Sequence, residues 1–504
     1  MQITRRHFFA TVGTVTALAS APHLIAGASS TSAAPTNAKN TENKGIKWFS
    51  STQASNWQSL AAPKITDAGQ LMPFDYDFDI QLDKPKQTIE GFGAAFSEKG
   101  WEALTALDSQ KQSAVLQLLF DAHVGANFNL CRTPLGANDF SLKWYSYDET
   151  EADFDLKHFS IDNDKKTLIP FIQAAQKIRP DLAVWASPWS PPTWMKKNRH
   201  YAMTPNWPGG VVNGLQPHQI GEEGKDYFIL EPKYLKAYAK YFRKYVEAYR
   251  KQFINIFAVM PQNEFNSAQP FPSCCWTPDG LNQFIPVLAE EMAPLGVNVL
   301  LGTLERGDAG LVDKVMNNPN SASVIKGVGV QWAGKHALPF IKNNYPQLKI
   351  WGTEQECGAG TNDWHYAKYA WNLIKTYLNN GASAYQYWNM ILSTDVHSTW
   401  GWPQNSLITV DTKNKTFSLN PEYYVMRHLS GLVQPGAKFI PASSFTGYEN
   451  QLAFLNPDGS LAIVIQNEMA EELTVKAKLG SKLIEMKLAP DSYNSLLIPK
   501  QDYS

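Results

Sequence analysis

Short apolar runs recur along the middle of the chain, and a segment with helical spacing follows each run. Apolar residues occupy both faces of these runs, which is typical of parallel strands buried on two sides. Eight such strands alternating with helices predict an α/β fold of the (β/α)8 TIM-barrel type. An open, doubly wound sheet is the alternative, although no glycine-rich phosphate loop follows the first strand. The predicted strands are residues 89–96, 128–134, 183–188, 254–260, 297–303, 324–332, 348–353 and 382–389.

The helices between these strands are marked by amphipathic patterns. The pattern is clearest in residues 232–252, where five tyrosines fall on one stripe with Lys and Arg opposite. The predicted helices are residues 97–120, 168–178, 232–252, 278–293, 309–317 and 364–379.

Strand-like segments flank this region on both sides. Residues 46–84 contain short alternating runs, and residues 426–504 contain more, punctuated by the turn Asn456-Pro457-Asp458-Gly459. A closed barrel of residues 85–425 has no free edge, so the strands of the two flanks need each other as partners. We therefore expect an associated all-β, sandwich-like domain built from the N- and C-terminal segments.

The first residues predict a targeting segment. The twin arginines Arg5 and Arg6 precede a weakly apolar run, and Ala26-Gly27-Ala28 offers a cleavage site. Residues 1–28 are therefore interpreted as a twin-arginine signal peptide and residues 29–45 as a flexible linker, which predicts a periplasmic or secreted protein. No later stretch approaches the ~20 apolar residues of a membrane span.

Composition excludes some functions and favours others. The formal net charge is −1 and the pI about 6.8, so no basic field favours nucleic acid. Sixteen tryptophans and twenty-one tyrosines are enough to line a sugar-binding cleft as well as a core. The four cysteines lack zinc-ligand spacing, and we interpret them as mostly buried thiols, with a disulfide possible but not required.

Functional groups of a TIM barrel gather at the carboxyl ends of its strands. These ends carry carboxylates, tryptophans and amides, without the histidine cluster of a metal site or the G-x-S-x-G turn of a serine hydrolase. Paired carboxylates among aromatic rings fit glycoside cleavage. The residues concerned are Glu98, Arg132, Trp189, Asn263, Glu264, Glu305, Trp332, Glu354, Trp388 and Asn389.

Glu264 follows the fourth strand and Glu354 ends the seventh. In a barrel of eight strands, we expect these two carboxylates to face one another across the mouth. A separation of about 5 Å predicts retention of the anomeric configuration, whereas about 6.5–9.5 Å predicts inversion.

Six ordered motifs between about residues 87 and 410 resemble glycoside hydrolase family 30, and in particular its acid β-glucosidases or glucosylceramidases. They are GFGAAFSE (91–98), CRTPLGANDFSLKWYSYD (131–148), ASPWSPPTWMK (186–196), PQNE (261–264), IWGTEQECG (350–358) and QYWNM (386–390). The resemblance implies a cofactor-free, retaining double displacement on β-glycosides.

The resemblance also implies roles for individual residues. Glu264 would be the general acid/base and Glu354 the nucleophile, with Glu356 as the rival candidate. Asn263 would bind the sugar 2-hydroxyl, and Arg132 would keep the nucleophile ionised.

The remaining motif residues would hold the sugar. Trp189, Trp388 and Asn389 would contact the non-reducing sugar, and Glu98 would bind its 4- and 6-hydroxyls. Glu98 departs from the Asp of the animal lysosomal members, and Phe265 stands where many members have Pro. Trp194, Trp332 and Asn405 have two interpretations, barrel packing or substrate contact, and Asp139 and Tyr145 are possible rim residues.

We therefore expect an exported, retaining β-glucosidase of the glucosylceramidase type, acting on an oligosaccharide, glycan or glycolipid. The alternatives within the family are an endo-β-1,6-glucanase and a β-xylosidase. A non-catalytic carbohydrate-binding protein would be expected to lack one of the two glutamates, and both are present.

Overall fold

The computed structural model describes residues 45–503. The predicted signal peptide and all but the last residue of the predicted linker lie outside the described residues. Within residues 45–503, no helix has both the length and the apolar character needed to cross a membrane.

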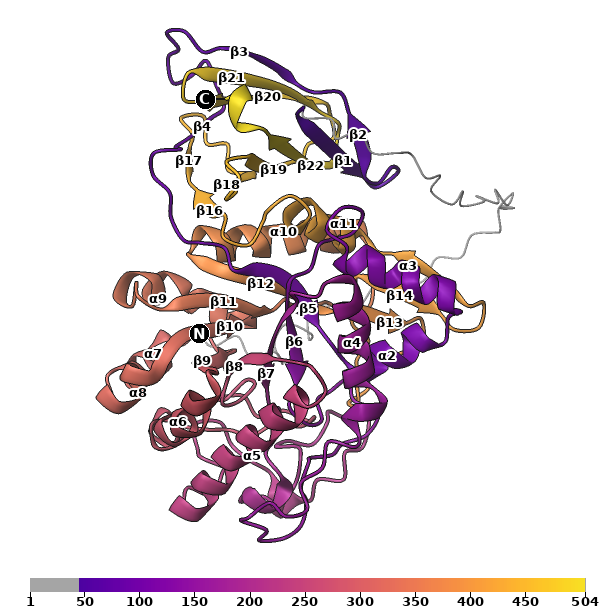
Figure 1. Ribbon diagram of the computed structural model, residues 1–504, viewed down its shortest axis with the longest axis vertical. Helices are drawn as coiled ribbons and strands as arrows, with labels where there is room; N and C mark the ends of the chain where they lie inside the picture. The colour runs from indigo at the N-terminus through magenta and orange to yellow at the C-terminus, as the bar shows by residue number, and fades with distance from the viewer. Residues whose placement is uncertain (1–44, 504) are drawn as a thin grey trace. The chain divides into compact units, whose positions relative to one another are not determined.

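Eight parallel strands form a closed barrel in which the strand order follows the sequence and the last strand pairs with the first (Figure 1). The predicted barrel is confirmed, and the alternative of an open sheet is wrong because its ends are joined. The strands are β5 (Gly91–Ala95), β6 (Leu130–Pro134), β7 (Ala183–Ser187), β8 (Ile256–Val259), β9 (Asn298–Leu304), β10 (Ile325–Gln331), β11 (Lys349–Glu354) and β12 (Ala382–Asn389).

Helices alternate with the barrel strands along the chain. They are α2 (Glu98–Thr105), α3 (Ser109–Phe120), α4 (Leu168–Ile178), α5 (Pro232–Arg250), α6 (Pro278–Met292), α7 (Ala309–Met316), α8 (Pro319–Val324), α9 (Leu338–Asn344), α10 (Trp364–Asn379) and α11 (Pro421–Ser430). Short 3-10 helices occur at Asp164–Lys166, Thr193–Met195, Pro217–Gln219, Ala293–Leu295, Trp332–Ala337 and Lys500–Asp502.

One predicted helix, residues 97–120, is two helices in the structure. The side chain of Asp108 accepts a hydrogen bond from the backbone N–H of Lys111 at 2.9 Å. This cap starts α3 afresh after α2 has ended at Thr105.

Large rings fill the barrel interior. Trp185 of β7 and Trp351 of β11 lie with ring centroids 5.8 Å apart, in a cluster with Met260 and Leu300. The indole N–H of Trp185 donates to Gln386 Oε1 at 3.0 Å, so its polar atom is satisfied in the interior. The barrel is therefore a packed core that can support a rigid site at one end.

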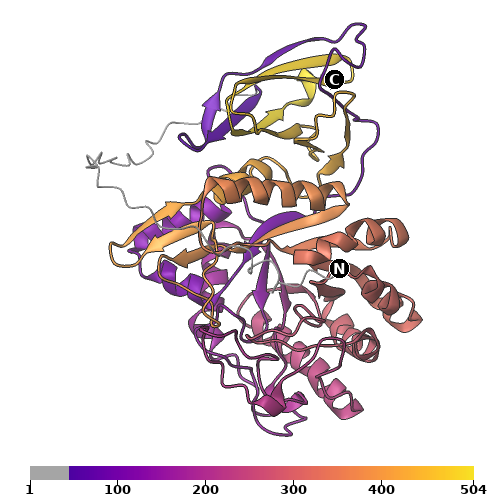
Figure 2. The ribbon, with the colours of Figure 1, turned by 180° about the vertical axis from the view of Figure 1, so that it is seen from behind.

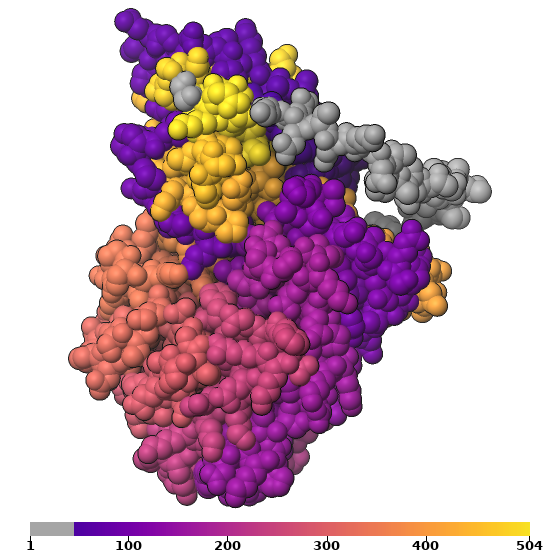
Figure 3. All heavy atoms as spheres, viewed as in Figure 1, coloured from indigo at the N-terminus to yellow at the C-terminus, as the bar shows by residue number. Residues whose placement is uncertain are grey.

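Two β-sheets form the predicted sandwich-like domain from both flanks of the barrel. The six-stranded sheet has the order β16 (Lys438–Ile440), β18 (Gln451–Leu455), β19 (Leu461–Asn467), β22 (Ser492–Ile498), β1 (Lys47–Thr52) and β2 (Gln58–Leu60). The five-stranded sheet has the order β17 (Ala442–Ser443), β4 (Phe78–Ile80), β20 (Leu473–Leu479), β21 (Lys482–Leu488) and β3 (Lys64–Asp67). Indigo N-terminal strands therefore lie beside yellow C-terminal strands (Figure 1), and indigo and yellow atoms lie together at this end of the molecule (Figure 3).

Helix α11 joins the barrel to this domain. The buried ring of His428 contacts Ser495 Oγ of β22 at 2.8 Å through Nδ1 and Ser51 Oγ of β1 at 2.9 Å through Nε2. Burial lowers the pKa of His428 to about 3, so the ring is neutral. The predicted domain boundary between residues 425 and 426 falls inside this helix.

A small sheet that the sequence did not indicate follows the last barrel strand (Figure 2). It consists of β13 (Ile391–Ser393), β14 (Ile408–Asp411) and β15 (Thr416–Leu419). The loop between β13 and β14 carries Trp400 and Trp402.

All four cysteines, Cys131, Cys274, Cys275 and Cys357, are buried free thiols.

Candidate active site

Two glutamates emerge at the carboxyl ends of the fourth and seventh barrel strands. Strand β8 ends at Val259 and leads to Glu264, whereas Glu354 is the last residue of β11. Their residue surfaces are 3% and 6% exposed, so both carboxylates lie in a largely dry environment.

The backbone of Glu264 is held in an unusual conformation. Its φ of 48° lies in the left-handed region, which costs a non-glycine residue about 1–3 kcal/mol. Thr303 Oγ1 accepts a hydrogen bond from its N–H at 2.9 Å, and its carbonyl accepts one from the N–H of Ser267 at 2.9 Å. These contacts hold the turn after β8 in place and fix the direction of the carboxylate.

Arg132 of β6 connects the two strand ends. Its Nη1 donates to Glu354 Oε2 at 3.0 Å, and its Nη2 donates to Asn263 Oδ1 at 2.7 Å and Ser187 Oγ at 2.9 Å. The guanidinium is fully buried, and burial lowers its pKa to about 10, so it remains a cation at neutral pH. A buried cation of this kind requires a buried anion, and Glu354 supplies it.

Gln331, the last residue of β10, lies between both glutamates. Its Nε2 is 3.4 Å from Glu264 Oε1 and 3.2 Å from Glu354 Oε2. The two carboxylate oxygens are therefore at most 6.6 Å apart, the sum of these two distances. Two carboxylates so close can act on one atom of a substrate.

The environment of Glu354 combines opposing effects on its pKa. Burial raises the pKa to about 7, and the negative charges of Glu264 and Asp139 act in the same direction. The charge of Arg132 and the hydrogen bond from Trp332 Nε1, 2.8 Å from Glu354 Oε1, lower it. The pKa of Glu354 therefore lies near neutral pH, and three donors, from Arg132, Gln331 and Trp332, favour the ionised form.

Tryptophans surround the guanidinium. Trp189 and Trp388 stack with ring centroids 5.4 Å apart, and the guanidinium carbon of Arg132 lies 4.3 Å and 5.6 Å from their ring centroids. Both rings are almost fully buried. The structure therefore brings the predicted Trp189, Trp388, Trp332 and Asn263 to the same place as the two glutamates.

The remaining predicted residues are held by protein contacts. Asn389 Nδ2 donates to Gln404 Oε1 at 3.0 Å. Glu98 accepts hydrogen bonds from Asn163 Nδ2 at 2.8 Å, Thr167 Oγ1 at 2.9 Å and the N–H of Leu142 at 3.0 Å. The carboxylate of Glu98 thus ties three segments together, and its predicted sugar contact stays a prediction.

For Trp332, Trp194 and Asn405 the sequence left open whether the side chain packs in the barrel or contacts substrate, and the structure separates the three. Trp332 contacts Glu354, whereas Trp194 Nε1 donates to the carbonyl of Asp148 at 2.9 Å and Asn405 Nδ2 donates to Glu422 Oε1 at 2.6 Å. Trp194 and Asn405 are buried in these positions, which is the packing interpretation.

Two other acids near the strand ends, Glu356 and Glu305, form ion pairs with residues other than Arg132. Lys335 Nζ lies 2.6 Å from Glu356 Oε1, and Tyr369 donates to Glu356 Oε2 at 2.6 Å. Glu305 forms an ion pair with Arg306. Glu354 rather than its rival Glu356 is therefore the acid that Arg132 and Gln331 contact.

Sequence reasoning gave no role to three residues of this cluster. Gln331 contacts both glutamates, Gln269 Nε2 donates to Glu264 Oε2 at 2.9 Å, and the charge of Asp139 acts on both Arg132 and Glu354. Gln331 was detectable as a polar residue at a strand end. Gln269 and Asp139 lie in loops, where the pattern gives no direction for a side chain.

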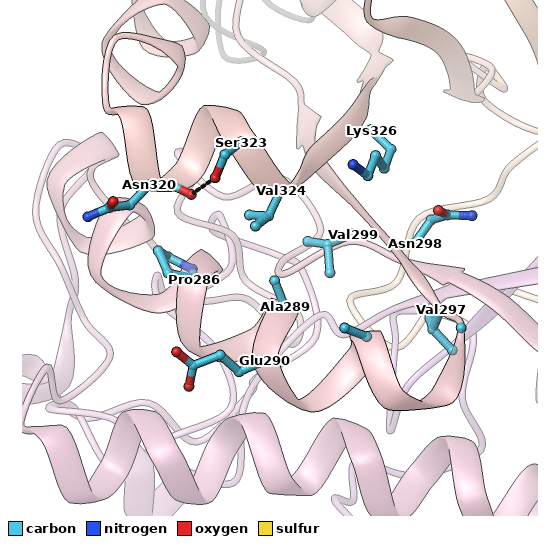
Figure 4. Close-up of a pocket in the computed structure, with 12 residues that line it drawn as sticks. Pro286, Ala289, Glu290, Val297, Asn298, Val299, Asn320, Ser323, Val324 and Lys326 are labelled. Atoms are coloured by element: carbon cyan, nitrogen blue, oxygen red, sulfur yellow. Dashed lines mark hydrogen bonds between the residues drawn. The ribbon is translucent and has the colours of Figure 1, made fainter.

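The hollow drawn in Figure 4 is a different place. It measures about 780 Å³, and its walls come from α6, α8 and the beginning of β9, including Ala289, Val299 and Val324. Thr303, which contacts Glu264, lies near the other end of β9. The hollow is therefore separate from the glutamates.

Comparison with known families agrees with this arrangement. Residues 89–433 match the glycosyl hydrolase family 30 TIM-barrel domain, and residues 436–496 match the beta sandwich domain of the same family.

Curated relatives align over most of their length. A putative glucosylceramidase 2 of Caenorhabditis elegans is 30% identical over 416 residues, covering 78% of this chain and 76% of the relative. The lysosomal acid glucosylceramidase of Mus musculus is 28% identical over 78% of both chains. An endo-1,6-beta-D-glucanase of Neurospora crassa is 29% identical over 78% of this chain and 82% of its own.

Solved structures share the fold. SrfJ from Salmonella typhimurium superposes with a TM-score of 0.78 at 22% identity, covering 90% of this chain and 99% of that one. The endo-beta1,6-glucanase BT3312 gives 0.77 at 21% identity, covering 90% and 100%. With a family model matched over most of the barrel and a second over the sandwich, the chain belongs to glycosyl hydrolase family 30 and is a glycoside hydrolase.

Proposed function

We propose that this glycoside hydrolase is a retaining β-glucosidase in which Glu354 is the nucleophile and Glu264 the general acid/base. The observation that carries the proposal is the common contact of both carboxylates with Gln331 Nε2, which keeps their nearest oxygens within 6.6 Å of one another, close enough for both to act at one anomeric carbon. This upper limit includes the spacing of about 5 Å of retaining enzymes, in which no water has to fit between the nucleophile and the sugar.

In the first step, the ionised carboxylate of Glu354 attacks the anomeric carbon. The bond from that carbon to the leaving oxygen breaks, and Glu264 gives its proton to that oxygen. The donors Arg132, Gln331 and Trp332 hold Glu354 in place and favour its ionised form.

In the second step, water replaces the leaving group. Glu264 takes a proton from the water, whose oxygen attacks the anomeric carbon and releases Glu354 as a carboxylate. Two inversions at one carbon give net retention.

The surrounding side chains suit the binding of one sugar ring. Asn263 Oδ1 accepts from Arg132, Thr303 and Gln331, which assigns the amide nitrogen as the donor toward a ligand. Asp139 is a buried acid near Glu354, and we propose it, in addition to Glu98, as a partner of the sugar hydroxyls.

The relatives support two substrate classes. Those named glucosylceramidases favour a single β-glucosyl unit on a variable leaving group, a lipid included. A second candidate is internal cleavage of β-1,6-glucan, which the fungal relative named endo-1,6-beta-D-glucanase favours.

A substrate panel separates these candidates. We expect the wild type to hydrolyse aryl β-glucoside, gentio-oligosaccharides and glucosylceramide, with aryl β-xyloside as the test of the sugar. The first product observed by NMR should be the β-anomer, and an initial α-anomer would contradict retention. Cleavage of only long β-1,6 chains would replace the glucosidase with the glucanase.

Substitution tests the assigned roles. Glu354→Gln should lose at least about 1,000-fold of its activity on all substrates. Glu264→Ala should retain activity on a dinitrophenyl glucoside, whose leaving group needs no proton, and azide should accelerate it to give a β-glucosyl azide. Glu356→Gln is the matched control, and a loss there equal to that of Glu354→Gln would overturn the assignment.

We also propose that the protein is exported by the twin-arginine route, on the basis of Arg5, Arg6 and the Ala26-Gly27-Ala28 site. Replacement of Arg5 and Arg6 by lysine should leave the protein unprocessed in the cytoplasm of a bacterial host. Unchanged export of that variant would contradict the proposal.

A further inference from the structure

Gln331 places one amide group within reach of both glutamates, and its contacts define which way the amide points. Nε2 faces Asn263 Oδ1, Glu264 Oε1 and Glu354 Oε2, of which the amide oxygen of Asn263 and the ionised carboxylate of Glu354 can only accept a hydrogen bond. On the other side, Oε1 faces Arg132 Nη1 at 3.4 Å and Thr353 Oγ1 at 3.0 Å, and both are donors. A flipped amide would place its oxygen against the oxygens of Asn263 and Glu354 and its NH2 group against the guanidinium of Arg132, so the contacts define one orientation.

We propose that Gln331 is a positioning residue that donates to whichever of the two glutamates carries the negative charge at each stage of the reaction. This inference rests on the proposed double displacement. It adds a role that neither glutamate can supply for itself, a neutral donor common to both.

The number of hydrogens makes the role specific. An amide nitrogen carries two hydrogens, and Gln331 Nε2 faces three acceptors. Its hydrogens can therefore serve two acceptors at a time, and the strongest acceptor is an ionised carboxylate.

The charge changes place during the cycle. In the first step of the proposed double displacement, Glu354 reacts as the carboxylate and Glu264 reacts as the acid that donates the proton. In the glycosyl-enzyme Glu354 is an uncharged ester and Glu264 is the carboxylate that will take a proton from water. A small rotation of one amide follows this exchange, and no side chain has to enter or leave the site.

The fold holds Gln331 where this exchange requires it. Gln331 is the last residue of β10 and its backbone is paired with that of Glu354 in the neighbouring strand. The side chain is fully buried, and Thr353 Oγ1 fixes its carbonyl. The amide is thus anchored at its oxygen and reaches the carboxylates with its nitrogen.

The test uses Gln331→Met, which keeps the length of the side chain and removes the donor. With a dinitrophenyl β-glucoside, the burst of released phenol reports the first step and the steady state reports the second. We expect both steps to slow by roughly 10- to 100-fold, the usual effect of losing a hydrogen bond to a charged group. The acidic limb of the kcat/KM profile should also move to higher pH, since the ionised nucleophile loses a donor.

Two variants make the comparison specific. Gln269→Met removes a donor that contacts Glu264 and Ser267 but not Glu354, so it should leave the acidic limb in place. Gln176→Met makes the same change on the outer helix α4 and controls for the substitution itself. Should Gln331→Met fold poorly, Gln331→Glu keeps the shape and adds a third carboxylate, which should move the acidic limb to higher pH.

The outcomes separate this inference from the proposed function. Trapping of Glu354 by a 2-deoxy-2-fluoroglucoside tests the double displacement in the wild type, and failure there would remove the proposed function. Suppose that the wild type is trapped but Gln331→Met slows only one step or keeps the wild-type pH profile. The role proposed for Gln331 would then be wrong, and the roles assigned to Glu264 and Glu354 would stand.

Discussion

Arg132 Nη1 lies 3.0 Å from Glu354 Oε2, and the side chains of the two residues are 0% and 7% exposed. In a site this dry, the guanidinium is the main influence that opposes burial and holds down the pKa of the nucleophile. The chemistry of the site therefore depends on a cation that never needs to touch the substrate.

We expect Arg132→Met to raise the pKa of Glu354. The ionised fraction then falls at a given pH, so the acidic limb of the kcat/KM profile should move up by about 1–3 pH units. Arg199→Met, which removes a surface ion pair with Glu151, is the control. A profile with an unchanged acidic limb would mean that the carboxylate of Glu354 does not set that limb.

Asp139→Asn should act in the opposite direction. The negative charge of Asp139 raises the pKa of Glu354, so its removal lowers that pKa and moves the acidic limb to lower pH. The KM for glucosides should rise because the amide is a weaker acceptor for sugar hydroxyls. Asp155→Asn on the surface is the control. A rise in KM together with an acidic limb that moves to higher pH would contradict the argument from the charge of Asp139.

Aromatic rings continue from the site toward the surface. Phe271, in the loop that follows Glu264, lies 5.5 Å from Trp400, and Trp400 lies 5.0 Å from Trp207, which is 44% exposed. Phe271 and Trp400 share a buried cluster with Trp189 and Trp388, so these rings connect the site with the surface.

We predict that Trp207→Ala raises KM roughly two- to tenfold for gentiobiose or glucosylceramide, the loss expected for one ring contact. An aryl glucoside with its short leaving group should be hydrolysed as by the wild type. Phe253→Ala removes an exposed ring just before β8, at the other end of the barrel, and is the matched control. Equal effects on long and short leaving groups would rule out contact between Trp207 and the leaving group.

His428 makes stability depend on pH. Its pKa is about 3 in the folded protein and about 6.5 in an unfolded chain, so between these values the unfolded chain binds a proton that the folded one excludes. Stability is therefore full above about pH 6.5 and falls toward pH 3, by up to about 1.4 kcal/mol per pH unit.

We expect His428→Gln to flatten this dependence. Glutamine can still meet Ser51 and Ser495, and it does not titrate. Urea unfolding measured across that pH range provides the comparison, with His365→Gln on the exposed face of α10 as control. A wild-type slope in the His428→Gln variant would show that other groups cause the acid sensitivity.

The barrel was predictable because its signal is long-range and repeated. The predicted strand at residues 382–389 and helices at 168–178 and 364–379 have the observed bounds, since each is a continuous apolar or amphipathic run. The small sheet β13–β15 was missed because its strands are three or four residues long and depend on tertiary contacts.

The candidate site was predictable at the strand ends and not in the loops. Glu264, Glu354, Arg132 and Asn263 meet because β6, β8 and β11 determine where their side chains start. Glu98 and Asp139 are both acids that follow strands, and only the folded loops reveal that Glu98 contacts Asn163 and Thr167 while the charge of Asp139 acts on Arg132. Sequence patterns predict where a loop begins but not where its side chains point.

Strand β22 lies between β19 and β1 in the six-stranded sheet. The ribosome synthesises β1 before the barrel and β22 after it. Strand β1 therefore lacks its partner β22 until more than four hundred further residues have been synthesised. A truncated chain that contains the whole barrel would still expose the edge of β1, and a chaperone or a protease could recognise that edge as the mark of an unfinished molecule.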